Sequence, residues 1–600
     1  MTFLNPLISR LNNRLYDSRD QALRIIRAII LITSITGMGL VIYIYGFEYD
    51  DDVRIWLINS IIVLLVIFIL CYLARFLYAF QHAEFLKDTR WEALVLLLAS
   101  LSIFIFFNSA FHYWFPSLRP EKVKMYSETL ITGLLLLLIL FEVARALLSI
   151  GEVKLRPGVA FVVSFLLLIS VGTGLLMLPT MTTQPGSLSV IDALFTSVSA
   201  SCVTGLIVVD TATDFTLRGQ VVILLLMQTG GLGMLTFATF FATLLNSELG
   251  IRQTRLIPDY LDNQTLGAAR PLLRRIVLLT LMVEGGTFLA LMYLWGDYPF
   301  DTWGQKVFFS LFHAVSAFCN AGFSLFSNGL YEPIVRNMYL LHTAVALSLI
   351  LGSLGFSPVY NIFSPRQLRQ RLAKPWIDWT LSTKIAVNMA IILLGVGTLG
   401  FYWLERTNTL QEMNLAEAMV TSFFQSATTR TAGFNTVDIS QLTQPTVVLF
   451  MFLMFIGGSS GSTAGGIKTS TFFLLVASVI STSRGSSRVI IGNRYIPNTI
   501  IFKALSIFFY GIAINLIGVF ILSISEPDLN IIDLTFEQVS AFGTVGVSRG
   551  ITASLTSVGK VVLIVSMFLG RVGTLTFAVA LSTRAASQAY KLPKDELMVG

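Results

Sequence analysis

The sequence predicts an all-α polytopic membrane protein in which four repeats of helix, pore loop and helix surround one central pore, preceded by four extra N-terminal transmembrane helices. Composition is the first indication, because 54% of the 600 residues are hydrophobic and only 12% are charged, far fewer charges than in soluble domains. The mean hydropathy is +0.75. Apolar stretches of about 20 residues, long enough to cross a bilayer, recur along the chain. In the second part of the chain they come in pairs, and each pair encloses a shorter apolar segment.

The first four apolar stretches lie near 25–46, 55–79, 91–111 and 127–149. The residues before them are polar and include arginines, so we expect no cleavable signal peptide and a first span that is retained. A polar joint, GEVKLRPG, follows the fourth stretch. We therefore predict that residues 1–150 form a unit of four transmembrane helices.

The paired stretches predict four repeats, each with two spans and a half-apolar segment too short to cross the membrane between them. The expected span pairs are 158–180 with 219–245, 274–296 with 337–361, 383–404 with 445–480, and 500–523 with 557–583. The corresponding units are 151–250, 251–365, 366–485, and 486–600 with a cytoplasmic C-terminus.

A motif of small residues recurs once in each enclosed segment. It reads SASCVTGL, SAFCNAGF, SATTRTAGF and SAFGTVGV, and its glycines are Gly205, Gly322, Gly433 and Gly546. The glycines are separated by 117, 111 and 113 residues, a period that indicates a repeated structural unit. A single such motif is more often a helix-packing patch, but four copies at one period favour a pore.

The charges of the connecting segments predict the orientation. Lysine and arginine gather in 252–275, 366–384 and 484–503, whereas the segments with the four motifs contain few. Because cytoplasmic loops are enriched in these residues, the motifs should enter from the outer side and both termini should lie in the cytoplasm. The net charge of +7 is explained in the same way, so no nucleic-acid partner is expected.

The four motifs have the chemistry of a cation site. A half-helix that enters from outside presents its carbonyl end to the central axis, and glycine lets several carbonyls point the same way. The candidate ion-binding residues are Val203, Thr204, Gly205, Asn320, Ala321, Gly322, Thr431, Ala432, Gly433, Thr544, Val545 and Gly546. Asp192 and Asp533 are candidate caps of two half-helices.

These motifs, together with GGSSGSTAGGIKTST and GRVGTLTF, resemble the Ktr/Trk/HKT superfamily of potassium transporters over about 158–585, and the Ktr-type ion-translocating subunit most closely. The resemblance implies a potassium-channel-like pore in which K+ crosses the cell membrane through a filter with one glycine per repeat. It also implies a homodimer with a cytoplasmic ring of nucleotide-binding regulatory subunits. A Na+ transporter or Na+-dependent K+ transporter of the same fold is the alternative, and Gly205, which is serine in the sodium-preferring branch, favours K+.

The glycine-rich segment 457–470 interrupts the second span of the third repeat. Its spacing does not fit a phosphate-binding loop, because one extra residue separates the second glycine from Lys468. The resemblance implies an intramembrane gating loop, with a simple kink as the alternative. Arg571 places a positive charge within the last span, where a charged side chain costs free energy. It would face this loop or bind helix-end carbonyls. The gate residues are Gly457, Gly458, Gly461, Gly465, Gly466, Lys468 and Arg571.

The remaining polar residues of the half-helices suggest structural roles. Arg430 is expected to pair with Glu537 behind the filter, and His313 to pack within its half-helix. Cys202 and Cys319 are read as small pore-helix residues, not as ligands. A membrane-embedded enzyme is a remote alternative, because no catalytic constellation lies at membrane depth, and no organic cofactor is expected.

Overall fold

The computed structural model describes residues 4–79, 81–107, 120–149, 157–233, 269–296, 298–374, 376, 378–486, 488–492 and 494–573. Within these ranges the regular secondary structure is helical apart from one two-stranded hairpin. Five described helices are long and apolar enough to cross a membrane, or six if one bent pair is a single span. The all-α membrane fold expected from the sequence is therefore confirmed.

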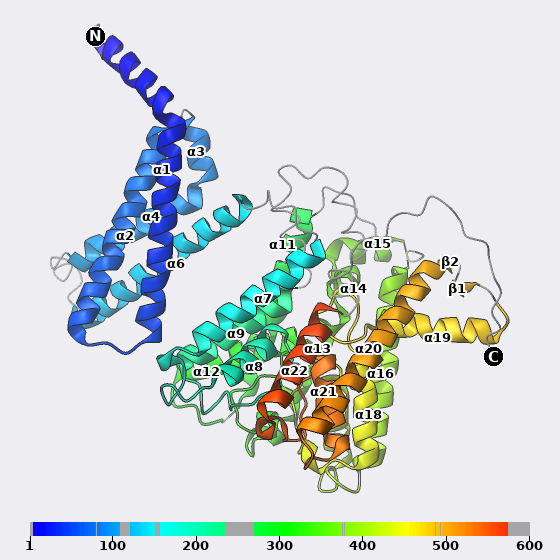
Figure 1. Cartoon of the computed structure of the whole chain (residues 1–600). Coiled ribbons are helices and arrows are strands. Elements are labelled where there is room, and N and C mark those ends of the chain that lie inside the picture. Colours follow the sequence, from blue (N-terminus) through cyan, green and yellow to red (C-terminus); the bar gives the residue numbers. More distant parts are fainter. Residues whose placement is uncertain are drawn as a thin grey trace.

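The N-terminal unit is a helical bundle that lies beside the rest of the molecule (Figure 1). Its core contains Ile61, Leu65, Ala99, Ile131 and Leu135, which are buried between the helices. The short α3 links the second and third spans and was not predicted. The bundle consists of α1 (Leu4–Gly46), α2 (Asp51–Leu77), α3 (His82–Asp88), α4 (Arg90–Phe107) and α6 (Pro120–Ser149).

Ion pairs join the bundle helices close to the ends of the spans. Arg75 of α2 and Arg145 of α6 both bind Glu92 at the start of α4, and Glu142 lies beside both arginines. Because a buried carboxylate is stable only when it is paired, these contacts fix the relative positions of the helices.

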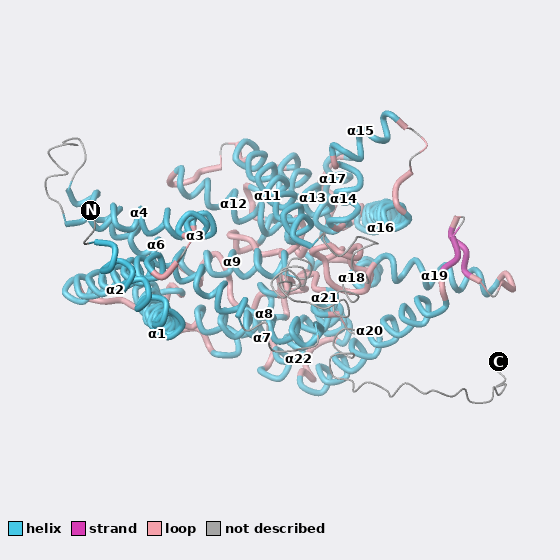
Figure 2. The backbone as a smooth tube through the Cα atoms, turned by 90° about the horizontal axis from the view of Figure 1, so that it is seen from above, coloured by secondary structure: helices cyan, strands magenta, loops and turns pink. Residues whose placement is uncertain are grey.

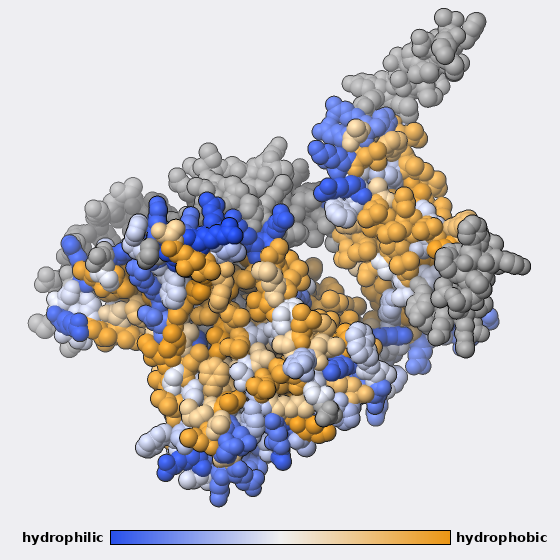
Figure 3. All heavy atoms as spheres, turned by 180° about the vertical axis from the view of Figure 1, so that it is seen from behind, coloured by the Kyte–Doolittle hydropathy of each residue, from blue (hydrophilic) through white to orange (hydrophobic). Residues whose placement is uncertain are grey.

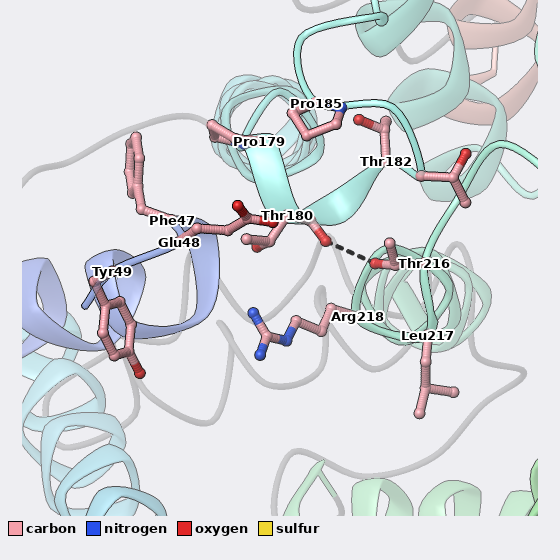
Figure 4. Close-up of a pocket in the computed structure, with 11 residues that line it drawn as sticks. Phe47, Glu48, Tyr49, Pro179, Thr180, Thr182, Pro185, Thr216, Leu217 and Arg218 are labelled. Atoms are coloured by element: carbon pink, nitrogen blue, oxygen red, sulfur yellow. Dashed lines mark hydrogen bonds between the residues drawn. The ribbon is translucent and has the colours of Figure 1, made fainter. Parts of the chain in front are cut away.

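The bundle contacts the first repeat where α1 ends. The Tyr45 carbonyl accepts hydrogen bonds from Thr180 Oγ1 and from Arg218 Nη1, the latter at 3.2 Å. Figure 4 shows Arg218 extending between the 47–49 turn and the segment around Thr180, and these groups line a pocket of about 610 Å³. Figure 2 shows that the bundle lies on one side of the molecule and does not encircle it.

The first two repeats each contain an outer helix, a short pore helix and a second outer helix. The first comprises α7 (Pro157–Leu176), η2 (Pro179–Met181), α8 (Val190–Ser201) and α9 (Leu217–Leu232). The second comprises α11 (Ala269–Leu294), α12 (Trp303–Cys319), η6 (Gly329–Tyr331), η7 (Val335–Asn337), α13 (Tyr339–Leu354), α14 (Phe356–Phe363) and α15 (Pro365–Ala373).

The third and fourth repeats follow the same order. The third comprises α16 (Leu381–Glu405), α17 (Leu415–Thr428), η8 (Ile439–Gln441), α18 (Gln444–Phe455) and α19 (Thr469–Ser483). A hairpin of β1 (Val489–Ile491) and β2 (Arg494–Ile496) joins it to the fourth. The fourth comprises α20 (Asn498–Ser525), α21 (Ile531–Gly543), η9 (Thr552–Ser554) and α22 (Ser557–Val572). The hairpin was not predicted.

Two second spans are broken, one where the sequence predicted a continuous span and one at the glycine-rich segment where it indicated an interruption. The stretch 337–361 forms α13 and α14, which meet at 108° where Gly355 has φ +88°. The stretch 445–480 forms α18 and α19 with a loop between them. The expected continuations of α9 to residue 245 and of α22 to residue 583 lie outside the described residues.

The repeats close into a ring because the second helix of each packs against the pore helix of the next. The packed pairs are α9 with α12, α13 with α17, α18 with α21, and α22 with α8. The four pore-helix ends therefore meet inside one helical ring.

The surface fits a membrane, since hydrophobic residues form a broad band with hydrophilic residues on both sides of it (Figure 3).

Candidate functional site

The pore helices begin at hydroxyl or amide caps. Ser189 caps α8, Thr302 caps α12, Asn414 caps α17 and Asn530 caps α21. A short side chain at this position accepts a backbone hydrogen bond that the first turn leaves open.

Asp192 and Asp533, expected as caps, lie instead within the first turns of α8 and α21. Carboxylates are also favoured there by the helix dipole. Asp192 pairs with Lys560 at 2.7 Å, and Asp533 pairs with Arg549 at 2.9 Å. Both acids therefore tie a pore helix to another segment and do not cap it.

Shortly after the end of each pore helix, one residue has a left-handed backbone conformation. It lies two residues before the repeated glycine, at Val203 (φ 58°), Asn320 (φ 60°), Thr431 (φ 101°) and Thr544 (φ 49°). These four are the non-glycine residues with positive φ in the described chain. Such backbone costs roughly 1–3 kcal/mol per residue and clusters at functional sites. The repetition of this strain in all four repeats indicates a common turn.

The four glycines form a closed ring, which we call the glycine ring (Gly205, Gly322, Gly433 and Gly546). A methyl group built on Gly205 would lie 2.5 Å from the Ala321 carbonyl oxygen of the next repeat. The same contact recurs from Gly322 to Ala432 and from Gly433 to Val545, both at 2.5 Å, and from Gly546 back to Thr204 at 2.1 Å. All four glycines have positive φ. No side chain can therefore be added to the ring without moving a neighbouring backbone.

A buried hydroxyl braces each segment of the ring from behind. Ser199 Oγ donates to the Leu206 carbonyl at 2.7 Å, and Ser316 Oγ donates to the Phe323 carbonyl at 2.8 Å. In the fourth repeat Ser540 Oγ accepts from Gly546 N at 3.2 Å. The third repeat has one extra residue before its glycine, and Thr428 takes the serine's place by donating to the Phe434 carbonyl at 2.7 Å.

The glycine-rich segment between α18 and α19 lies against the broken helix of the second repeat. Ser459 N donates to the Ser353 carbonyl at 2.9 Å, and Phe356 N donates to the Gly461 carbonyl at 3.1 Å. The loop closes on itself through Gly457 N and the Ile467 carbonyl, 2.9 Å apart. The bend at Gly355 thus accommodates the loop of the third repeat.

The same loop also contacts the residues that precede the glycine ring. Thr463 Oγ1 lies 3.2 Å from the Asn320 side-chain amide and 3.3 Å from the Phe318 carbonyl. A methyl group on Gly465 would lie 2.0 Å from Thr544 Oγ1. A methyl group on Gly457 would lie 3.4 Å from Thr431 Cγ2. The loop therefore packs against residues of three of the four ring segments.

Arg571 connects the loop to the first repeat. It is 1% exposed, and its Nη1 donates to the Thr463 carbonyl while its Nη2 donates to the Gly230 carbonyl at 2.5 Å. Both positions expected for Arg571 are found together, because it faces the loop and also binds backbone carbonyls. The predicted gate residue Lys468 stays within the loop, because its Nζ donates to the Ala464 carbonyl at 2.5 Å.

The expected pair between Arg430 and Glu537 is wrong. Arg430 is 3% exposed and its guanidinium contacts the Ala390 carbonyl of α16 at 3.5 Å. Glu537 instead accepts hydrogen bonds from Ser548 and Thr552. The two residues extend from different pore helices toward different outer segments, which sequence spacing alone does not reveal.

The other half-helix residues lie in the interior, as expected. Cys202 and Cys319 are fully buried, and Cys319 lies beside Gln228 and Glu284. His313 is buried among aromatic rings. In the described part of the chain, no three His, Cys, Asp or Glu side chains are grouped to hold a metal ion.

Comparison with known proteins identifies the family. The family model described as TrkH, cation transport protein, matches residues 133–591. The chain is 38% identical to the Ktr system potassium uptake protein B of Bacillus subtilis over 75% of this chain and 98% of that protein. It is 34% identical to the potassium/sodium uptake protein NtpJ of Enterococcus hirae over 74% and 98% of the two chains.

A solved structure supports the same fold. The potassium transporter TrkH from Vibrio parahaemolyticus superimposes with a TM-score of 0.58 at 18% identity, over 82% of this chain and 97% of that chain. The family match begins within α6, before the unit boundary predicted at residue 150. The chain belongs to the Ktr/Trk family of cation transport proteins, a family of transporters and not of enzymes.

Proposed function

We propose that this protein takes up K+ across the cell membrane through the glycine ring. The observation that carries the proposal is the closed cycle of contacts from Gly205 through Gly322 and Gly433 to Gly546. A ring of backbone carbonyls can replace the hydration shell of K+, and the carbonyls of Thr204, Ala321, Ala432 and Val545 are the ones that lie against the glycine of the preceding repeat. The name of the Bacillus subtilis relative, a potassium uptake protein, supports the same ion.

Side chains of the ring segments offer further oxygen ligands. The hydroxyls of Thr204, Thr431 and Thr544 are buried and have no hydrogen-bond partner among the described residues. A buried hydroxyl without a partner costs free energy, so a passing ion or its water would be a favourable neighbour. The three threonines and the four glycines, together with Val203, Asn320, Ala321, Ala432 and Val545, form the proposed ion-binding filter.

The loop beneath the ring is the proposed gate. It fills the space below three ring segments, and the Arg571 guanidinium adds a positive charge that opposes an approaching cation. Opening requires the contacts of Thr463 with Phe318 and Asn320 to be released, together with the loop's contacts to Ser353 and Phe356. Gly457, Gly458, Gly461, Gly465 and Gly466 supply the flexible backbone for this movement.

Assembly and regulation are inferred from the Ktr-type resemblance. We expect a lipid-embedded homodimer with both termini in the cytoplasm and a cytoplasmic ring of nucleotide-binding regulatory subunits. The basic segment of α15 and the hairpin of β1 and β2 contain exposed Arg366, Arg369, Arg488 and Arg494, which is consistent with a cytoplasmic side. A pull on the helix ends near the loop, such as α19, would then open the gate.

Sodium is the second candidate ion. The Enterococcus relative is named a potassium/sodium uptake protein, so Na+ transport or Na+ dependence is the alternative. Gly205 favours K+ because a ring without side chains presents only backbone carbonyls at this level.

Growth of a K+-uptake-deficient bacterium at low K+ tests the proposal. Expression of the full chain with its regulatory subunit should restore growth and produce K+ and Rb+ uptake well above Na+ uptake. Na+ uptake without K+ or Rb+ uptake would identify a sodium transporter. No ion uptake by membrane-inserted protein would contradict the proposed function.

A further inference from the structure

A second set of equivalent residues lies on the pore helices, three positions before the hydroxyl that braces each ring segment. These residues are Thr196, His313, Gln425 and Glu537. All four are buried, with at most 2% of each residue exposed. Each is polar at membrane depth, where an unsatisfied polar group is costly. Their partners therefore indicate what each one does.

In three repeats this side chain binds a hydroxyl just beyond the glycine ring. Glu537 Oε1 accepts from Ser548 Oγ at 2.6 Å, two residues after Gly546. His313 Nε2 lies 3.0 Å from Ser324 Oγ, two residues after Gly322. Gln425 Nε2 donates to Thr436 Oγ1 at 3.0 Å, three residues after Gly433.

The first repeat lacks this contact. The residue two positions after Gly205 is Ile207, which has no hydroxyl, and Thr196 Oγ1 has no hydrogen-bond partner among the described residues. The first repeat therefore provides a natural comparison within the same ring.

Glu537 makes the most extensive of these contacts. In addition to Ser548, its carboxylate accepts from Arg549 N at 2.9 Å and from Thr552 Oγ1 at 2.8 Å. The Arg549 side chain pairs with Asp533 of the same pore helix. Every partner of Glu537 donates a hydrogen, which suits an acceptor-only carboxylate. Charge-assisted hydrogen bonds are also the strong ones.

We propose that Glu537, with weaker contributions from His313 and Gln425, positions the outer ends of the ring segments and so determines ion selectivity. The inference rests on the proposed filter. Three of the four ring segments are held at two points, by the brace before the glycine and by this contact after it. Loss of the second point would let the segment shift, and carbonyls that shift by tenths of an ångström discriminate less between K+ and Na+.

Glu537→Gln tests this directly, because it keeps the shape but replaces an acceptor oxygen with a donor group. We expect a K+/Na+ uptake ratio roughly tenfold lower than in the wild type, since a charged hydrogen-bonding group is lost. Ser548→Ala, which removes one of the three contacts, should lower the ratio by a smaller factor. His313→Leu and Gln425→Leu should each lower the K+/Na+ uptake ratio by no more than Glu537→Gln does.

Thr196→Val is the matched control. It changes the equivalent position in the repeat that lacks the contact, so the ratio should stay at the wild-type value. The readouts are the Na+ and K+ uptake rates and the KM for K+, each normalised to the amount of protein in the membrane. A merely structural role would lower the amount of protein and leave the ratio unchanged.

Gly205→Ser in the same assay separates the two possible failures. If Gly205→Ser lowers the ratio but Glu537→Gln and Ser548→Ala do not, the positioning role is wrong and the filter stands. If Gly205→Ser also leaves the ratio unchanged, the proposed filter itself is wrong. Should Glu537→Gln fail to reach the membrane, Ser548→Ala decides the question.

Discussion

The glycine ring and the layer directly beneath it are built on opposite principles. The ring repeats one local structure four times, with a left-handed residue two positions before each glycine and the same glycine-to-carbonyl contact between neighbours. Among the residues that the structure describes, the layer beneath shows no such repetition. It combines a loop from the third repeat, Arg571 from the fourth, the Gly230 carbonyl from the first and the bend at Gly355 from the second.

This difference fits the proposed division of tasks, in which the ring is the filter and the loop is the gate. A site that must surround an ion evenly benefits from equivalent backbone on all sides. A gate needs an element with two discrete arrangements, and one loop that can leave is sufficient. Among the described residues, each repeat contributes a different element to the layer beneath the ring.

The largest effect is expected from adding a side chain to the ring. In Gly205→Ser, a Cβ would lie 2.5 Å from the Ala321 carbonyl oxygen at φ +88°. Strain of ~1–3 kcal/mol in one ring segment should lower the K+/Na+ uptake ratio by roughly 5- to 100-fold. Relative uptake of the two ions is the measurement.

Gly186→Ser is the matched control for this change. Gly186 has a similar φ of +76°, but nothing lies within 4 Å of its Cβ position. It should retain wild-type selectivity, so a loss of selectivity there would mean that backbone strain anywhere in the protein produces the effect, and not a change in the ring.

A smaller effect is expected from Arg571→Ala in the layer beneath. At a separation of about 10 Å and an effective dielectric constant of about 20, a unit positive charge would raise the energy of a cation by ~1.7 kcal/mol. On that estimate, removal of the Arg571 charge should raise K+ flux by roughly 20-fold while the K+/Na+ ratio changes little. Arg571→Lys keeps the charge and should retain low flux. Equal fluxes of the alanine variant and the wild type would show that the arginine has only a structural role.

The smallest effect on K+ flux is expected from a change at Asn320, whose side chain connects a ring segment to the loop. Asn320 has a left-handed backbone conformation, and its side-chain amide contacts Thr463 of the loop. Asn320→Gly leaves the left-handed backbone conformation accessible, because glycine adopts it readily. The substitution removes the hydrogen bond to Thr463, which contributes ~0.5–1.5 kcal/mol. K+ flux without the regulator should rise by roughly two- to tenfold.

Val203→Gly provides the comparison for Asn320→Gly. Val203 has the same left-handed backbone in the first repeat, but its neighbours are apolar residues of the hydrophobic core. Any effect of glycine flexibility should be common to both variants. If both raise the flux by the same factor, the contact between Asn320 and Thr463 does not hold the loop.

The repeated elements were predictable from the sequence, and the unique contacts were not. The period of Gly205, Gly322, Gly433 and Gly546 reveals the ring because each glycine meets the same backbone requirement. The partner of Glu537 could not be predicted, because Ser548 and Thr552 are set by how the chain turns after the ring. The break at Gly355 also escaped prediction, since one glycine in an apolar stretch is compatible with a continuous span.

The loop deletion tests the division of tasks most directly. Residues 459–465 would be removed and the purified protein, without any partner, reconstituted in liposomes for K+ and Na+ flux measurements, with a check that it remains folded. The account predicts K+ flux well above the wild-type closed level and an unchanged K+/Na+ ratio, because the gate is lost and the ring is kept. Flux that stays at the closed level in folded protein, or a ratio that falls toward one, would contradict the account.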